Sequence, residues 1–67
     1  MEVVVNGEWI QLPENIVCVS DVLKHYDIQD KVVVVEVNGD ILTRLEHQST
    51  RISAKDRIEI VHFVGGG

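Results

Sequence analysis

The residues best suited to chemistry stand at the end of the sequence, where Gly65, Gly66 and Gly67 follow one another. Glycine has no side chain and a large conformational entropy to lose on ordering, so we expect this segment to add nothing to folding. At about 3.3–3.6 Å per extended residue, three residues reach about 10 Å. Such a tail can enter a narrow channel in which any Cβ would clash, and it projects the Gly67 carboxylate beyond the sheet. A frayed terminus has the same composition, so glycine content alone does not identify a functional tail. The residues that precede the glycines must distinguish the two cases.

Other side chains with chemical potential are scattered. His25, His47 and His62 fall on a predicted helix, a loop and a strand without paired ligand spacing, so we predict no metal site. Glu46 and His47 pair a carboxylate with an imidazole, but adjacent loop residues without a neighbouring nucleophile make no catalytic triad. The lone Cys18 cannot form an internal disulfide, and we interpret it as a small buried apolar residue.

Length and charge restrict the kind of function. A chain of 67 residues forms one domain and has too little bulk to enclose a substrate, so a catalytic pocket of its own is not expected. The formal charge of −5 disfavours nucleic acid and anionic membranes and favours a larger partner with a basic groove. With no membrane-spanning apolar run, no signal-like start and no disulfide, we expect a cytoplasmic protein.

Two hairpin signals frame one helix signal. Glu2 to Leu12 holds two apolar runs broken at Asn6-Gly7, and Asn38-Gly39 repeats that turn. Between the hairpins, helical spacing predicts a short helix with Ser20 as its cap. Its apolar stripe comprises Val19, Val22, Leu23 and Tyr26.

The second half of the chain predicts further strands. The unbroken run Val32 to Val35 suggests a strand buried on both faces, and Asp40 to Thr43 a short return strand at an edge. Arg44 to Lys55 is polar and mixed, and reads as a connection anchored by Ile52.

The last predicted strand, Arg57 to Val64, has two unlike faces. Alternation places Ile58, Ile60, His62 and Val64 on one face, toward the helix. On the other, Val61 and Phe63 form an exposed apolar patch at the root of the tail. We expect this strand to pair in parallel with the first. Trp9 either joins that patch or covers the sheet edge, and Arg44 and Arg57 either pair with a partner or stay solvated.

These elements predict an α+β fold: a mixed four- to five-stranded sheet with one main helix across one face. Residues 1–64 are expected to form the domain and residues 65–67 a flexible tail.

Several motifs together resemble the ubiquitin-like β-grasp sulfur carriers over nearly the whole chain, and among them the branch serving thiamine biosynthesis. They are Val5-Asn6-Gly7-Glu8, the helix around Val19 to Leu23, Val35-Glu36-Val37-Asn38-Gly39, Arg44 with Glu46-His47, and the run from Asp56 to Gly67. Thr43, where the family commonly has proline, and Ala54-Lys55, in place of a usual glycine, depart from the pattern within loops.

The resemblance implies a carrier and not an enzyme. An E1-like adenylyltransferase would use ATP and Mg²⁺ to adenylate Gly67, and a sulfur donor such as a cysteine desulfurase would convert the adenylate to a thiocarboxylate. Thiazole synthase would then receive the sulfur. Gly65 and Gly66 would lie in the partners' channels, with Val61, Phe63 and Val64 as the docking patch. ATP and magnesium belong to the partner, because this chain lacks a phosphate-binding Gly-rich loop between strand and helix.

Three alternatives remain open from sequence. The small subunit of molybdopterin synthase shares the resemblance and the Gly-Gly end. A covalent protein modifier would share the tail. A plain interaction domain would bind through Val61 and Phe63 and leave the tail inert.

Overall fold

Two Asn-Gly turns build the sheet from hairpins. The structure is a computed structural model and describes residues 1–63. β1 (Glu2–Val5) and β2 (Glu8–Gln11) pair antiparallel across Asn6-Gly7, and β3 (Val33–Val37) pairs likewise with β4 (Asp40–Ile41) across Asn38-Gly39. All four turn residues have positive φ, between 50° and 93°. No atom lies within 4 Å of a Cβ built on either glycine, so the backbone conformation requires glycine and space does not.

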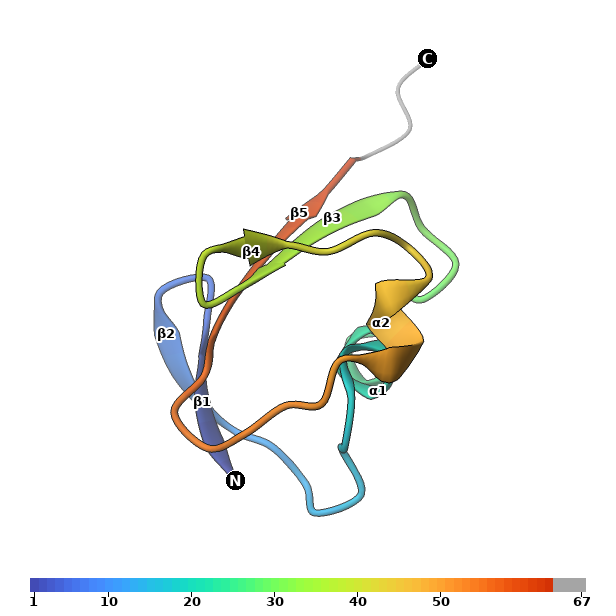
Figure 1. Cartoon of the computed structure of the whole chain (residues 1–67). Helices are drawn as coiled ribbons and strands as arrows, with labels where there is room; N and C mark the ends of the chain where they lie inside the picture. Colours follow the sequence, from blue (N-terminus) through green and yellow to red (C-terminus); the bar gives the residue numbers. More distant parts are fainter. Residues whose placement is uncertain (64–67) are drawn as a thin grey trace.

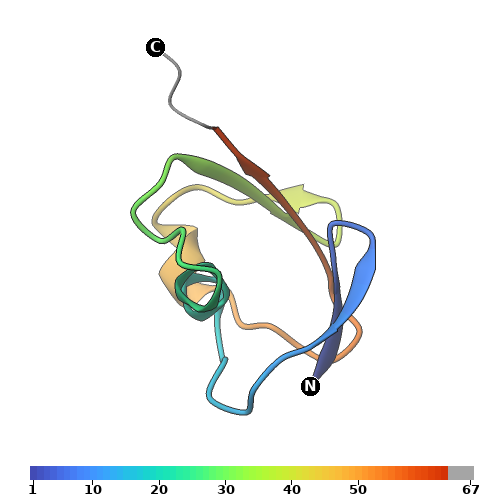
Figure 2. The ribbon, with the colours of Figure 1, turned by 180° about the vertical axis from the view of Figure 1, so that it is seen from behind.

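The last strand lies in the middle of the sheet. β5 (Arg57–His62) stands between the hairpins in the order β2-β1-β5-β3-β4 (Figures 1 and 2). It runs parallel to β1, with Val4 opposite Arg57, and antiparallel to β3 over five residue pairs. The predicted parallel return to the first strand and the edge position of the fourth strand are both confirmed.

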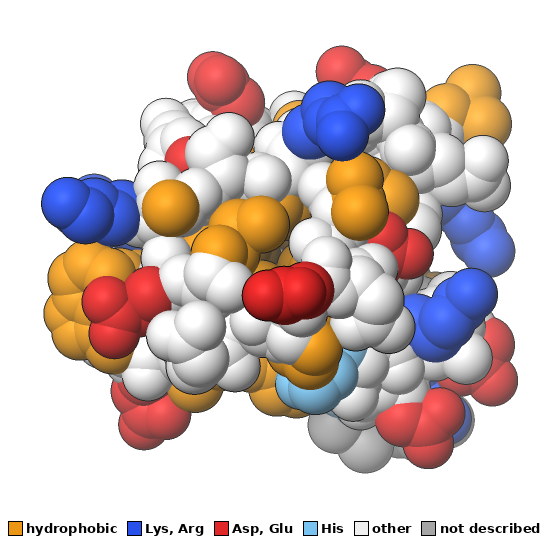
Figure 3. All heavy atoms as spheres, turned by 90° about the horizontal axis from the view of Figure 1, so that it is seen from below, with side chains coloured by type: hydrophobic (Ala, Val, Ile, Leu, Met, Phe, Trp, Pro, Cys, Tyr) orange, Lys and Arg blue, Asp and Glu red, His pale blue; other side chains and the backbone are white. Residues whose placement is uncertain are grey.

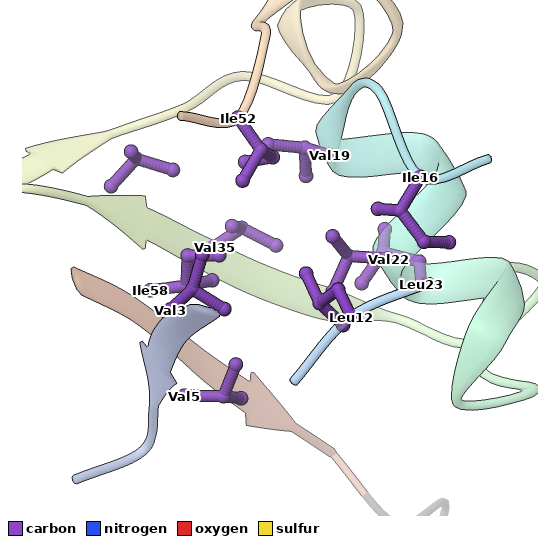
Figure 4. Packing of buried hydrophobic residues seen from close by; sticks show 11 residues of the cluster. Val3, Val5, Leu12, Ile16, Val19, Val22, Leu23, Val35, Ile52 and Ile58 are labelled. Atoms are coloured by element: carbon purple, nitrogen blue, oxygen red, sulfur yellow. The ribbon is translucent and has the colours of Figure 1, made fainter. Parts of the chain in front are cut away.

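Both helices cover the same face of this sheet. α1 (Val19–His25) and α2 (Glu46–Ser49) pack against each other, and the core lies between them and the strands (Figure 4). Within residues 1–63, neither helix is long and apolar enough to cross a membrane. The core consists of Val3, Val5, Leu12, Ile16, Val19, Val22, Leu23, Val35, Val37, Ile52 and Ile58. The predicted α+β architecture is therefore confirmed, with five strands.

The start of α1 differs from the prediction. The cap is Cys18 and not Ser20. The Asp21 carboxylate accepts hydrogen bonds from the backbone N–H groups of Val17, at 2.9 Å, and Cys18, at 3.1 Å. These two donors hold the pKa of Asp21 below its usual value. The carboxylate satisfies amides that precede the helix, so the helix begins earlier than a serine cap would place it.

The prediction that Val32 to Val35 is buried on both faces is wrong. Val35 is fully buried, but Val32 is 70% and Val34 39% exposed. Both helices lie on one side of the sheet, so alternate residues of β3 point to a face that no other element of residues 1–63 covers. The run of β-branched residues correctly indicates a strand, but it does not show that both faces of the strand are buried.

The segment 44–55 contains one element that periodicity did not predict, the four-residue α2. Just ahead of it, Thr43 N–H donates to the Glu46 carboxylate at 2.8 Å, and Glu46 N–H donates to the Thr43 hydroxyl at 3.4 Å. This reciprocal pair is a capping box, and its Thr-x-x-Glu spacing was the sequence signal that could have revealed the helix. Ile52 is buried, as predicted for the anchor of this segment.

Candidate docking face and tail root

Two asparagine side chains hold β5 from opposite sides. Asn6 accepts the backbone N–H of Ile60 at 2.7 Å and donates to the Ile60 carbonyl at 3.2 Å. Asn38 accepts the N–H of Arg57 at 2.9 Å and donates to the Asp56 carboxylate at 3.0 Å. Each asparagine thus serves its own turn and also fixes the strand that leads to the tail.

The end of β5 carries an exposed apolar cluster. Val61 is 53% and Phe63 55% exposed, on the sheet face that the helices leave open. Val61 stands opposite Val34, and the Phe63 N–H donates to the carbonyl of Val32 at 3.2 Å. The alternation of the last strand therefore places this cluster as the sequence predicted. Val64, Gly65, Gly66 and Gly67 lie outside the described residues.

Charged residues cross the same face further from the tail root. In the next row Glu59 stands opposite Glu36, which in turn stands opposite Ile41 on β4. Arg57 faces Val4, and Val4 faces Trp9 on β2. Trp9 is therefore on the open face, but the glutamate row separates it from Phe63. Arg57 is exposed and lines a hollow with Val4, Trp9, Asn38 and Lys55.

The three histidines are not brought together. His25 and His62 are exposed, so His62 does not rest against the core. His47 is 7% exposed, and its Nε2 has no hydrogen-bond partner among the described residues. Desolvation, followed by the charge of Arg44, lowers the pKa of His47 below its ordinary value. Arg44 is exposed and lines a hollow with His47 between the helices.

The Glu46 carboxylate is engaged by Thr43, so the adjacent glutamate and histidine form no catalytic dyad. Its bonds to the Thr43 amide and hydroxyl lower the pKa of Glu46. Across residues 1–63, no three His, Cys, Asp or Glu side chains are grouped to hold a metal ion. Cys18 is half-buried, with its Sγ 3.6 Å from the Asp21 carboxylate.

The face of the molecule seen in Figure 3 carries its charge in small separate groups. Figure 3, seen from below Figure 1, shows acidic side chains distributed over the whole outline, with hydrophobic patches between them. The hollows found among the described residues are open at the surface, and none of them is an enclosed cavity. We therefore take the exposed cluster of Val61 and Phe63 as the candidate functional surface of the described residues.

Comparison with known proteins gives consistent matches. The model of the ThiS family matches residues 2–67. The sulfur carrier protein ThiS of Bacillus subtilis (strain 168) is 36% identical over 62 residues, which cover 92% of this chain and 94% of the relative. The crystal structure of the thiamine biosynthesis protein ThiS from Geobacter metallireducens superposes with a TM-score of 0.82 at 30% identity, covering 100% of both chains. The uncharacterized protein ycf40 of Trieres chinensis is 36% identical over 53 residues, or 79% of this chain and 73% of the relative.

Proposed function

Since this chain belongs to the ThiS family of sulfur carriers, we propose that it carries sulfur as a thiocarboxylate on Gly67 for the thiazole ring of thiamine. The observation that carries the proposal is that the family match extends through Gly67. β5, the central strand of the sheet, is the last element of the described residues (Figure 1). Residues 1–64 act as the β-grasp domain, and residues 65–67 as the tail that is modified.

The chemistry begins with activation of a poor electrophile. A free carboxylate resists nucleophilic attack, so an E1-like adenylyltransferase joins a Gly67 oxygen to the α-phosphorus of ATP and releases pyrophosphate. A persulfide then attacks the carbonyl carbon with its terminal sulfur, and AMP leaves as the carbon–oxygen bond breaks. A second thiol attacks the sulfur–sulfur bond, forms a disulfide with the donor and frees the thiocarboxylate.

The role of this chain in these steps is presentation. Gly65 and Gly66 allow the tail to lie in a narrow channel, and Gly67 supplies the reacting carbon. Val61, Phe63 and Val64 dock against the partner and place the tail at the channel mouth. ATP and magnesium are bound by the adenylyltransferase, a cysteine desulfurase supplies the persulfide, and thiazole synthase accepts the sulfur. No side chain of the carrier acts as acid or base.

The thiamine branch is favoured over a molybdopterin-type carrier by the names of the relatives. The Geobacter protein with the same fold is described as a thiamine biosynthesis protein. A covalent protein modifier and an interaction domain with an inert tail are the remaining competitors. The modifier would form isopeptide conjugates in cells, and the interaction domain makes no use of the Gly67 carboxylate.

Intact-protein mass spectrometry tests the proposal. The chain is incubated with the adenylyltransferase, Mg-ATP, a cysteine desulfurase and cysteine. Exchange of one oxygen for sulfur adds about 16 Da, and omission of ATP or deletion of Gly67 abolishes the gain. The deletion variant should keep the thermal midpoint of the full chain, which shows that the tail and not the fold was lost. An unchanged mass with a demonstrably active enzyme system contradicts the proposal and favours the inert-tail interaction domain.

A further inference from the structure

The open sheet face has a definite order of side chains. The large hydrophobic residues exposed on it are Trp9, Val32, Val34, Ile41, Val61 and Phe63, and Val4 is half-buried. Two apolar rows lie at the tail root, Val32 with Phe63 and Val34 with Val61. The next row is acidic. The row beyond it contains the basic residue Arg57. The face therefore changes from apolar to negative to positive with distance from the tail.

The acidic row places two carboxylates side by side. Glu36 and Glu59 are direct cross-strand partners, both half-buried, between β3 and β5. Directly opposed residues have Cβ atoms about 5 Å apart, and like charges in this arrangement destabilise a sheet. The free protein thus keeps two negative charges together at the centre of its open face, at a cost to its own stability.

Neighbouring groups of the same chain do not offset this repulsion from within the row. The third member of the row is Ile41, which is apolar. Arg57 lies two residues from Glu59 along β5 and lines a hollow with Val4, Trp9, Asn38 and Lys55, and among the described residues it forms no ion pair with either glutamate. The flanking row toward the tail consists of Val34 and Val61. Both carboxylates therefore have no cationic partner among the described residues and are available to a cation from another protein.

We propose that Glu36 and Glu59 together receive one arginine or lysine side chain of the protein that docks on the Val61 and Phe63 cluster. This rests on the proposed function, in which that protein is the activating adenylyltransferase. Docking on the adjacent apolar rows removes water from the two carboxylates, and buried charges are tolerated only when paired. The planar guanidinium of arginine has enough donors to bridge both carboxylates.

A second copy of the chain is the wrong occupant for this face. Each copy has a net charge of −5, and a two-fold dimer through this face would bring four glutamates close together. A partner with an apolar patch and a central basic residue matches the order of the face. The glutamate pair would then reject surfaces that are apolar alone, since those leave the carboxylates buried and unpaired.

The test measures carrier affinity for the adenylyltransferase by fluorescence anisotropy, without ATP, so that binding is separated from chemistry. Glu36→Gln and Glu59→Gln each remove one charge and retain the side-chain shape. Glu14→Gln, in the exposed loop before α1, makes the same change in net charge away from the face. We expect each face variant to bind about 10- to 100-fold more weakly, and the control to bind within about twofold of the unmodified chain.

A second measurement gives the proposal a distinctive signature. Removing either charge relieves the repulsion, so the thermal midpoint of the free carrier should rise in the same variants whose affinity falls. Face variants that bind like Glu14→Gln, or that lose affinity together with stability, overturn the inference. If the unmodified chain still gains its sulfur in that case, the proposed function stands alone. If the unmodified chain neither binds the enzyme nor gains mass, both proposals fail.

Discussion

At the residue scale, His47 is the side chain whose environment is least satisfied. It is buried beside Arg44, and its Nε2 has no partner among the described residues. Burial disfavours the charged form of the imidazole. His47 therefore binds a proton less readily in the folded chain than in the unfolded one. Its pKa is lowered by folding, so protonation favours the unfolded state.

We therefore predict that the free energy of unfolding depends on pH through the protonation of His47. The free energy of unfolding should be largest above the ordinary histidine pKa of about 6.5, and should fall as the pH drops below it. His47→Phe keeps an aromatic ring of similar size and should remove that part of the pH dependence. Urea unfolding at about pH 7 and pH 5 measures it. The exposed His25→Gln is the matched control and should retain the slope. Equal slopes in the unmodified chain and His47→Phe contradict the assignment.

At the element scale, β5 depends on side chains as much as on its neighbouring strands. Its pairing with β1 covers only Val4 with Arg57 and Val5 with Ile58. The Asn6 side chain continues this ladder with two bonds to Ile60. β1 ends at the turn, so it has no backbone residue to pair with Ile60. The amide side chain of Asn6 makes those two hydrogen bonds instead.

Asn6→Gly separates the two roles of this asparagine. Glycine adopts the positive φ of the turn, so the hairpin conformation is kept and only the two bonds to Ile60 are lost. At about 1 kcal/mol for each exposed bond, the free energy of unfolding should fall by about 1–2 kcal/mol. Amide hydrogen exchange should show reduced protection at Ile60. Gly7→Ala, which instead strains the turn, serves as the contrast. Unchanged protection at Ile60 would show that the backbone pairing alone fixes the strand.

The elements predicted correctly are those that local chemistry specifies. Asn-Gly turns permit few alternatives, and the alternation of the last strand is regular. The prediction that Val32 to Val35 is buried on both faces was wrong, because a run of valines does not indicate whether another element covers the second face of the sheet. The helix α2 has four residues, which are too few to show a helical spacing of apolar residues in the sequence. Lys55 has φ of 70° in the left-handed region, so the loop keeps a glycine-like backbone even though the glycine usual in the resembled family is absent. The tail residues lie outside the described part, so their role stays a prediction.

At the scale of the whole molecule, one face of the sheet stabilises the fold and the other is exposed to solvent. One face builds the core with both helices, and the other exposes Val61 and Phe63. Substitutions on the second face should therefore change association without changing folding. The proposed docking function can be impaired in a chain that remains stable.

The double variant Val61→Thr with Phe63→Ser tests this separation. Both side chains are more than half exposed, so the free energy of unfolding should change by about 0.5 kcal/mol or less per site. Affinity for the adenylyltransferase should fall by about 2 kcal/mol or more, as for hot-spot residues. Val17→Thr, exposed in the loop before α1, should affect neither quantity. A double variant that binds as tightly as the unmodified chain would exclude this cluster from the interface.

The central place of β5 also governs when the fold can close. Asn6 and Ile60, joined by the Asn6 side chain, are 54 positions apart, and within residues 1–63 the strands of the two hairpins are connected only through β5. Ribosomes make chains from the N-terminus, so a nascent chain that has not yet reached residue 57 holds two hairpins with unpaired inner edges. Such a chain is open to proteases and to aggregation. The sheet can close only after β5 has been synthesised, so a truncated product that lacks this strand cannot join its two hairpins.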